Sequence, residues 1–416
     1  MSPWAGSGLG IASTCEIVLQ PLGAFIVDRA TGNFNTVNPD SLEILRYFGT
    51  RAPEKTDPLP ERADLKGLPR AKEIVRSMVK RGYLVRGGSG SFPDTTPEAS
   101  ILKATRADLE ITNRCNLHCC YCFVEANKHK GELSTPEWIE MLDGMIAHGL
   151  KVLLVTGGEP FLHKGALTII EWAVTHGLIV DVNTNGAYVT PEVARRLAKA
   201  KVRLVQISLD SVEPAHHDSL RGRGSHAKAM AAIHSLHNEG VMVRLATVLT
   251  GMNREQLPGL QRLAEELEVE FEVSPITRTG YARDIPEAVW QENFALSDAE
   301  RLESEDSESV LGFQGTCQSS VGAVSVSADG TLKPCGMAVD FFRPAGSLLL
   351  AEKSTRWWDR YYEVVRLEIL SSTVLDRPTR NLRIAEADGY ICQLQRLALG
   401  STAGVPRGLP GPLACE

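Results

Sequence analysis

Six apolar runs rich in β-branched residues alternate with helical patterns between residues 106 and 276, and this alternation limits the fold more than any other feature of the chain. Strands that alternate with helices pair in parallel, because each helix carries the chain back across the sheet. We therefore predict an α/β domain with a parallel sheet. The predicted strands lie near 107–112, 151–156, 178–184, 203–209, 241–249 and 269–276.

The first part of the chain is predicted to form a small α+β domain. Residues 15–37 alternate apolar and polar positions in short runs separated by turn-forming residues, which is typical of a β-meander. Asp40 is a suitable cap for the helix that follows. A second helix is predicted over 72–80, and Gly82 should end it.

Changes in composition indicate the domain boundaries. A run rich in glycine, serine, threonine and proline at 87–97 precedes the βα region, and an acidic run at 298–308 follows it. We expect an N-terminal domain over 1–86, a linker over 87–104, the βα domain over 105–285, an acidic connector over 286–312, a cysteine-containing domain over 313–400 and a disordered tail over 401–416.

Charge and hydropathy exclude several classes of partner. Hydrophobic residues make up 43% and charged residues 23% of the 416 residues, which is the balance of a folded globular protein. The net charge of -7 disfavours a nucleic-acid-binding surface, which normally carries a basic excess. The sequence has neither a run of 18 apolar residues nor a secretory signal pattern, so we expect a cytoplasmic protein without a membrane partner.

The strongest chemical signal is a group of cysteines directly after the first strand of the βα region. Cys115, Cys119 and Cys122 have C-x3-C-x2-C spacing, and Cys120 is an additional thiol inside the loop. Three thiolates on a [4Fe–4S] cube leave one iron open to another ligand, whereas a structural zinc site takes four protein ligands. The motif favours an iron–sulfur site with an open iron; a zinc loop and a set of buried thiols are the alternatives.

Polar residues follow the next three strands, at the edge where parallel sheets hold their ligands. After the second strand, paired glycines allow a close backbone approach and a carboxylate suits an ammonium group. Ordinary turn chemistry is the alternative at each position. The candidates are Gly157, Gly158 and Glu159 after the second strand, Asn183 on the third, Ser208 and Asp210 at the end of the fourth, and Arg221 as a carboxylate partner.

Other polar residues of this region carry weaker signals. His216 and His217 follow the fourth strand, and we predict that both lie on the surface. No catalytic base can be assigned, since Asp181, Glu270 and Glu272 all lie on predicted strands and alternation alone does not identify the inward-facing ones.

In order and spacing, the three-cysteine loop, the Gly-Gly-Glu-Pro turn at 157–160 and the Ser-Leu-Asp strand end at 208–210 resemble the radical S-adenosylmethionine (SAM) family. The resemblance covers about residues 105–280 and implies a partial (β/α)6 TIM barrel. It also implies a [4Fe–4S] cluster, SAM as the cofactor, and a reducing electron donor such as flavodoxin or ferredoxin. In that family, one electron cleaves SAM to a 5′-deoxyadenosyl radical, and the resemblance implies the same reaction here.

The resemblance assigns roles by position. Cys115, Cys119 and Cys122 would ligate the cluster, and Tyr121 would lie beside the adenine. For the rest of SAM it implies Gly157, Gly158 and Glu159 at the methionine ammonium, Ser208 and Asp210 at the ribose, and Arg221 at the carboxylate.

The cysteines near the end of the chain resemble part of a second cluster-binding domain. Cys317 and Cys335 flank a predicted hairpin with an Asp-Gly turn, like the start of a SPASM/Twitch domain. The later cysteine run of a full SPASM domain is missing from the sequence, where only Cys392 and Cys415 follow. We expect one auxiliary cluster on Cys317, Cys335 and Cys392, with Cys415 or a substrate group as the fourth ligand; a domain with unligated thiols is the alternative.

The N-terminal pattern of strands and helices resembles the winged-helix-like recognition element of ribosomal-peptide (RiPP) maturation systems, which adds a leader peptide to a sheet edge. This resemblance implies hydrogen abstraction from a ribosomally made precursor peptide, with an intramolecular crosslink as the product. Peptide epimerisation is one alternative, and action on a small sugar or nucleoside metabolite is another. The non-enzymatic alternative is an inactive iron–sulfur scaffold that binds peptides.

Overall fold

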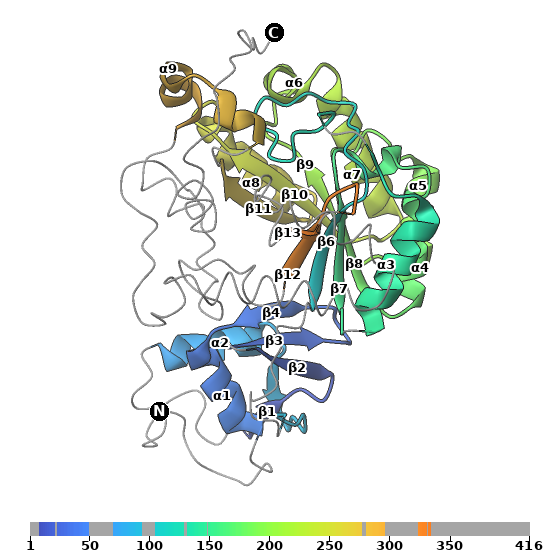
Figure 1. Ribbon diagram of the computed structural model, residues 1–416. Coiled ribbons are helices and arrows are strands. Elements are labelled where there is room, and N and C mark those ends of the chain that lie inside the picture. The colour runs from blue at the N-terminus through green and yellow to red at the C-terminus, as the bar shows by residue number, and fades with distance from the viewer. Residues whose placement is uncertain are drawn as a thin grey trace, which may run out of the picture. The chain divides into compact units, whose positions relative to one another are not determined.

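The structure is a computed structural model (Figure 1). One compact unit contains the described residues up to Thr105, and a second contains those of 106–295 and the strand from Val324. The structure describes residues 8–20, 23–49, 70–93, 105–128, 131–147, 149–276, 280–295, 323–330 and 332–333.

The first unit contains two small antiparallel sheets and two helices. Strands β2, β3 and β4 form a three-stranded sheet, and β1 pairs with β5. The predicted meander and both predicted helices are confirmed. The elements are β1 (Leu9–Ile11), β2 (Cys15–Gln20), β3 (Gly23–Asp28), β4 (Phe34–Val37), α1 (Pro39–Gly49), α2 (Ala71–Lys80) and β5 (Leu84–Arg86).

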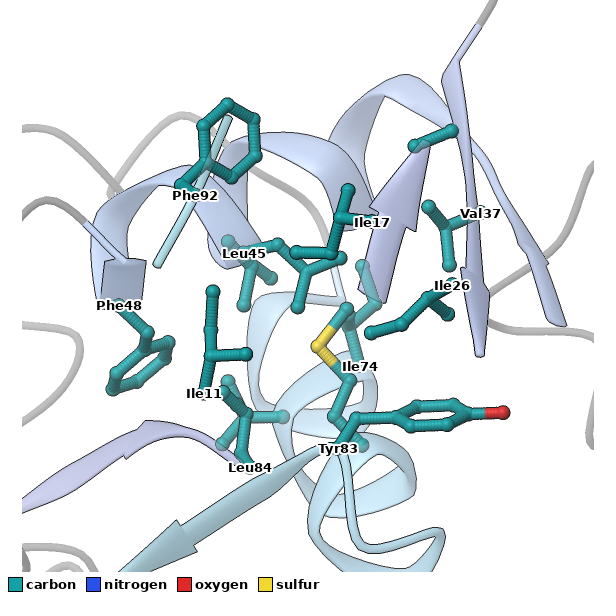
Figure 2. Packing of buried hydrophobic residues seen from close by; sticks show 14 of the residues in the cluster. Ile11, Ile17, Ile26, Val37, Leu45, Phe48, Ile74, Tyr83, Leu84 and Phe92 are labelled. Carbon is teal, nitrogen blue, oxygen red and sulfur yellow. The ribbon is translucent and has the colours of Figure 1, made fainter. Parts of the chain in front are cut away.

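Apolar side chains of both helices and both sheets form one core in this unit (Figure 2). Helix α2 contributes Ile74, Val75 and Met78, whose spacing places them on one buried face. Tyr83 is fully buried, and its hydroxyl donates to Asn35 Oδ1 at 2.8 Å. Each large apolar side chain buried here contributes about 1.5–3 kcal/mol relative to an exposed one.

The ends of the two helices test the predicted capping residues. Asp40 is not the cap of α1, contrary to the prediction: Asn38 Oδ1 accepts the Ser41 N–H at 2.8 Å, and Asp40 lies in the first turn. The reason is Pro39, which occupies the first helical position and leaves the cap to the residue before it. Gly82 follows α2 with φ +79°, which confirms the predicted end of that helix.

The second unit is an α/β fold around a mainly parallel sheet. All six predicted strands are present, and each pairs in parallel with its neighbour in chain order. They are β6 (Arg106–Glu110), β7 (Val152–Thr156), β8 (Ile179–Thr184), β9 (Leu204–Ser208), β10 (Val243–Leu249) and β11 (Glu270–Pro275).

Helices follow these strands and pack against the sheet (Figure 1). The Thr190 cap is confirmed, since its Oγ1 accepts the Val193 N–H at 3.3 Å. At Ser134, Glu137 accepts the backbone N–H at 2.8 Å and so supplies one half of the predicted capping box. The helices are α3 (Thr135–Ala147), α4 (Ala166–Thr175), α5 (Pro191–Ala200), α6 (Pro214–Arg221), α7 (Ser225–Asn238), α8 (Leu257–Glu266) and α9 (Glu287–Val289), with helical turns η2 (Pro160–Leu162), η3 (Arg254–Gln256), η4 (Gly280–Asp284) and η5 (Trp290–Phe294).

A hairpin that comes later in the chain than these six strands extends the sheet. Strands β12 (Ala323–Val326) and β13 (Leu332–Lys333) pair in antiparallel fashion, as predicted for this segment. The sheet order is β11-β10-β9-β8-β7-β6-β12-β13, so β12 lies beside β6, the strand that leads into the cysteine loop. Local patterning predicts the hairpin but not its neighbour, because that pairing spans more than 200 residues of chain.

Candidate functional site

The cysteine loop leaves the carboxyl end of β6 and is closed by one asparagine. The Cys115 N–H donates to Asn127 Oδ1 at 2.8 Å, and Asn127 Nδ2 donates back to the Cys115 carbonyl at 3.1 Å. Asn127 has φ +68°, a left-handed conformation that asparagine tolerates better than most residues. These two hydrogen bonds hold the ends of the loop together. The sequence analysis missed Asn127, because nothing in the cysteine spacing signals it.

The three motif cysteines lie close enough to affect one another electrostatically. Burial raises the pKa of Cys115 to about 11 and that of Cys119 to about 12, and neighbouring thiols of the motif add to both shifts. Burial also raises the pKa of Cys122, against backbone hydrogen bonds from Val124 and Ala126 that lower it. Thiols in this state release protons when they bind metal, since only thiolates are good ligands.

The paired glycines after β7 pack against the chain that enters the cysteine loop. A Cβ on Gly157 would lie 2.4 Å from the Thr112 carbonyl oxygen, and one on Gly158 would lie 2.4 Å from that of Arg114. The Gly158 N–H donates to Thr112 and the Glu159 N–H donates to Arg114, both at 2.8 Å. The close approach expected of these glycines is therefore made to the protein's own backbone, beside Cys115.

Glu159 joins the ends of β7 and β8. Its buried carboxylate accepts from Thr184 Oγ1 at 2.7 Å, from the Asn185 N–H at 2.9 Å and from the Phe161 N–H at 3.3 Å. Burial raises the pKa of Glu159 to about 7, although these donors oppose the shift. Asn185, which follows β8, contacts the cysteine loop: its Nδ2 donates to Asn116 Oδ1 at 2.9 Å. Asn185 is thus the residue of this strand end that contacts the loop, and the role of Asn183 as a cofactor contact stays a prediction.

A hydrogen-bonded cluster with little exposed surface joins Tyr121 of the cysteine loop to Asp210 and Arg221. Arg221 Nε and Nη2 donate to the two oxygens of Asp210 at 2.5 and 3.1 Å, and the Tyr121 hydroxyl makes a short hydrogen bond to the same carboxylate. The Arg221 guanidinium lies 5.7 Å from the centre of the Tyr121 ring. The structure brings together three residues that the sequence analysis had assigned to separate parts of the cofactor.

His217 is not a surface residue, contrary to the prediction. Its side chain is buried, and Nδ1 accepts the Asp210 N–H at 3.1 Å. Burial lowers the pKa of His217 to about 4, and the Arg221 charge adds to this effect. The spacing of His217 and Leu220, both on the buried side of α6, is the signal that could have identified it.

Side chains that alternate with the buried ones lie on the other face of the sheet. Asn183 and Ser208 are partly exposed there. Nearer the amino ends of the strands, charged residues form ion pairs. Arg203 pairs with Asp181, and Arg244 contacts both Glu270 and Glu272 at 2.6 and 2.7 Å. The three acidic residues considered as bases are therefore all engaged by arginine.

The remaining predicted ligands, Cys317, Cys335 and Cys392, lie outside the described residues. Within the described part of the chain, no group of His, Cys, Asp or Glu side chains is arranged to hold a single metal ion. The donor set at the loop fits an iron–sulfur cluster, because three half-buried thiols share one loop and the Leu117 N–H donates to Cys115 Sγ at 3.4 Å. No helix among the described residues is long and apolar enough to cross a membrane.

Comparison with known proteins identifies the fold around this site. Residues 109–264 match the model of the radical SAM superfamily. This segment is therefore similar to the radical SAM superfamily. The match agrees with the position of the cysteine loop at the carboxyl end of β6.

The curated proteins that this chain resembles are named for different activities. The mycofactocin maturase MftC of Mycolicibacterium smegmatis is 30% identical over 194 residues, covering 46% of this chain and 48% of that protein. An AdoMet-dependent heme synthase of Nitratidesulfovibrio vulgaris is 30% identical over 206 residues, covering 49% and 55%. The chain thus spans about half the length of the curated relatives it matches.

A solved structure resembles a larger share of the chain. Streptococcus suis SuiB bound to S-adenosylmethionine superposes with a TM-score of 0.59 at 15% identity, over 94% of this chain and 96% of SuiB. At this identity the similarity concerns the fold. It supports the predicted α/β architecture of a radical SAM partial barrel preceded by small antiparallel sheets.

Proposed function

We propose that this protein is a radical SAM enzyme that modifies a ribosomally made precursor peptide, abstracting a hydrogen atom from it and forming an intramolecular crosslink. The observation that carries the proposal is the gathering of Cys115, Cys119 and Cys122 in one loop at the carboxyl end of β6 in a chain that also has an N-terminal α+β unit. A resident cluster and SAM would supply the radical chemistry.

The protein's own residues hold and enclose this chemistry. Cys115, Cys119 and Cys122 would ligate the cluster. The glycines after β7 allow the backbone that enters the cysteine loop to pack closely against them. Glu159 would face the methionine ammonium, with the backbone around Gly157 and Gly158. Tyr121 would lie beside the adenine, and Arg221 would meet the carboxylate.

The substrate would bind at the face of the sheet that carries Asn183 and Ser208, opposite the face of the buried strand residues. Asn183 and Ser208 are partly exposed there, where they could bind hydroxyl groups of SAM or polar groups of the peptide. Asp210 is assigned a supporting role, because the protein's own donors occupy its carboxylate. One auxiliary cluster on Cys317, Cys335 and Cys392 would accept the electron that crosslinking releases, and flavodoxin or ferredoxin would deliver the initiating one.

The N-terminal unit favours a peptide over a small metabolite. Its three-stranded sheet has β2 and β4 as outer strands, and an extended leader peptide can add to such an edge through main-chain hydrogen bonds. SuiB, which this chain resembles in fold, has been crystallised with its precursor peptide SuiA. A heme synthase is similar to this chain over a comparable length, so the sequence similarity by itself does not favour a peptide over a small molecule.

The test uses the reconstituted, reduced enzyme with short peptides encoded beside its gene. A crosslink lowers the peptide mass by two hydrogen atoms, whereas epimerisation in deuterated water leaves a solvent deuteron on the product. We expect the mass loss, only with the full leader and only with intact Cys119; the variant Cys119→Ala is the control. Solvent deuterium without mass loss would favour the epimerase, and binding of no peptide would remove the peptide proposal.

A further inference from the structure

The carboxylate of Asp210 is fully buried and accepts four hydrogen bonds. Two come from Arg221 and one comes from the Tyr121 hydroxyl. The fourth is donated by the Val248 N–H to Oδ1 at 3.1 Å. Two carboxylate oxygens offer about four acceptor sites, so this side chain has no capacity left for a ribose hydroxyl.

The donors to Asp210, which itself follows β9, come from three separate elements. Tyr121 belongs to the cysteine loop, Arg221 is the last residue of α6, and Val248 lies on β10. The backbone of Arg221 also touches the loop, because its carbonyl lies 3.9 Å from Cys119 Sγ. One buried carboxylate thus fixes the orientation of the arginine relative to the cluster ligands.

The charges of this cluster are interdependent. Burial alone would raise the pKa of Asp210, but Arg221 and the hydrogen bonds outweigh it, and that pKa is lowered. Burial would lower the pKa of Arg221, but Asp210 and its other neighbours raise it further above its ordinary value. A buried guanidinium that loses its carboxylate would be uncompensated, so it would leave its position for water.

We propose that Asp210 is a positioning residue that grips two nitrogen atoms of Arg221 and directs the third, Nη1, at the carboxylate of bound SAM. This inference rests on the proposed function. Among the described residues, Nη1 makes no hydrogen bond, while Nε and Nη2 are both used by Asp210. The planar guanidinium cannot turn Nη1 elsewhere without releasing both. The arginine is thereby oriented before the ligand arrives.

The test compares SAM with decarboxylated SAM, which keeps the sulfonium and the amino group but lacks the carboxylate. Equilibrium binding of both is measured on cluster-loaded wild type, Asp210→Asn and Asp210→Glu, with iron content and near-ultraviolet circular dichroism as checks of integrity. Ser208→Ala is the matched control, because any effect at the ribose should weaken both ligands alike.

We expect wild type to prefer SAM, and Asp210→Asn to lose about tenfold of that preference while binding the decarboxylated ligand as before. A merely structural role would weaken both ligands equally, so a fully loaded variant with an unchanged preference overturns the inference. If Asp210→Asn does not fold, the ratio of the two affinities is measured on Asp210→Glu instead. Glutamate keeps the negative charge but shifts the carboxylate away from the Arg221 nitrogen atoms, so the preference for SAM should again fall. If wild type binds neither ligand, the proposed function itself falls.

Discussion

Glu159 illustrates how one buried group couples the site to pH. Its pKa is about 7, against 4.5 for the exposed side chain, so the folded state prefers the proton. The contribution of Glu159 to stability is therefore fully present below about pH 4.5 and is lost as pH rises through 7, by on the order of 3 kcal/mol. Glu159→Gln does not titrate. In urea unfolding of the cluster-free protein, the advantage of wild type over this variant should shrink from pH 5 to pH 8, and a constant or growing advantage would contradict the assigned shift.

Gly158 packs so closely against the backbone of Arg114 that a side chain at this position would clash. An added methyl group would meet the Arg114 carbonyl at 2.4 Å, so Gly158→Ala must displace the chain entering the cysteine loop. We expect a loss of about 1–3 kcal/mol in the free energy of unfolding and a lower iron content after reconstitution. Gly144→Ala in α3 is the matched control, since an added Cβ there would have no atom within 4 Å beyond its own helix backbone, and the variant should gain about 0.5–1 kcal/mol in the free energy of unfolding. Equal behaviour of the two variants would refute the packing argument.

At the scale of elements, the sequence predicts what local pattern determines. All six parallel strands follow from apolar runs between helices, and Pro191 after Thr190 correctly marks the start of α5. The errors concern partners distant in the chain or competing neighbours. Pro39 displaced the cap of α1, and His217 is buried because α6 turns it toward Asp210. Which donors reach Asp210 depends on how three elements meet, and no local pattern encodes that.

The cysteine loop is the element whose closure can be tested directly. Asn127 holds it with two hydrogen bonds and a left-handed backbone. Asn127→Gly keeps the permitted backbone and removes only the side-chain bonds, whereas Asn127→Ala also strains the backbone. We expect both variants to lose iron faster than wild type under a chelator, with alanine the faster. If the glycine variant loses iron no faster than wild type, the two side-chain hydrogen bonds of Asn127 are not needed to hold the cluster.

At the scale of the whole molecule, the two compact units suggest a division of labour. The second unit carries the cysteine loop and the residues proposed for SAM, and the first offers a small sheet with outer strands. The match to curated relatives covers about half of their length, while the SuiB fold extends over most of this chain. The proposed function assigns cofactor chemistry to the second unit and substrate choice to the parts of the chain outside it.

The central claim is that the cysteine loop supports cleavage of SAM, and the most direct test is release of 5′-deoxyadenosine. The protein is reconstituted with iron and sulfide without oxygen, reduced chemically, and supplied with SAM in the presence and absence of candidate peptides. Cys115→Ala is treated identically to expose background cleavage. We predict that the nucleoside forms with wild type and falls to background in the variant. Equal release by both proteins, or none from iron-loaded wild type with any peptide, would contradict the account.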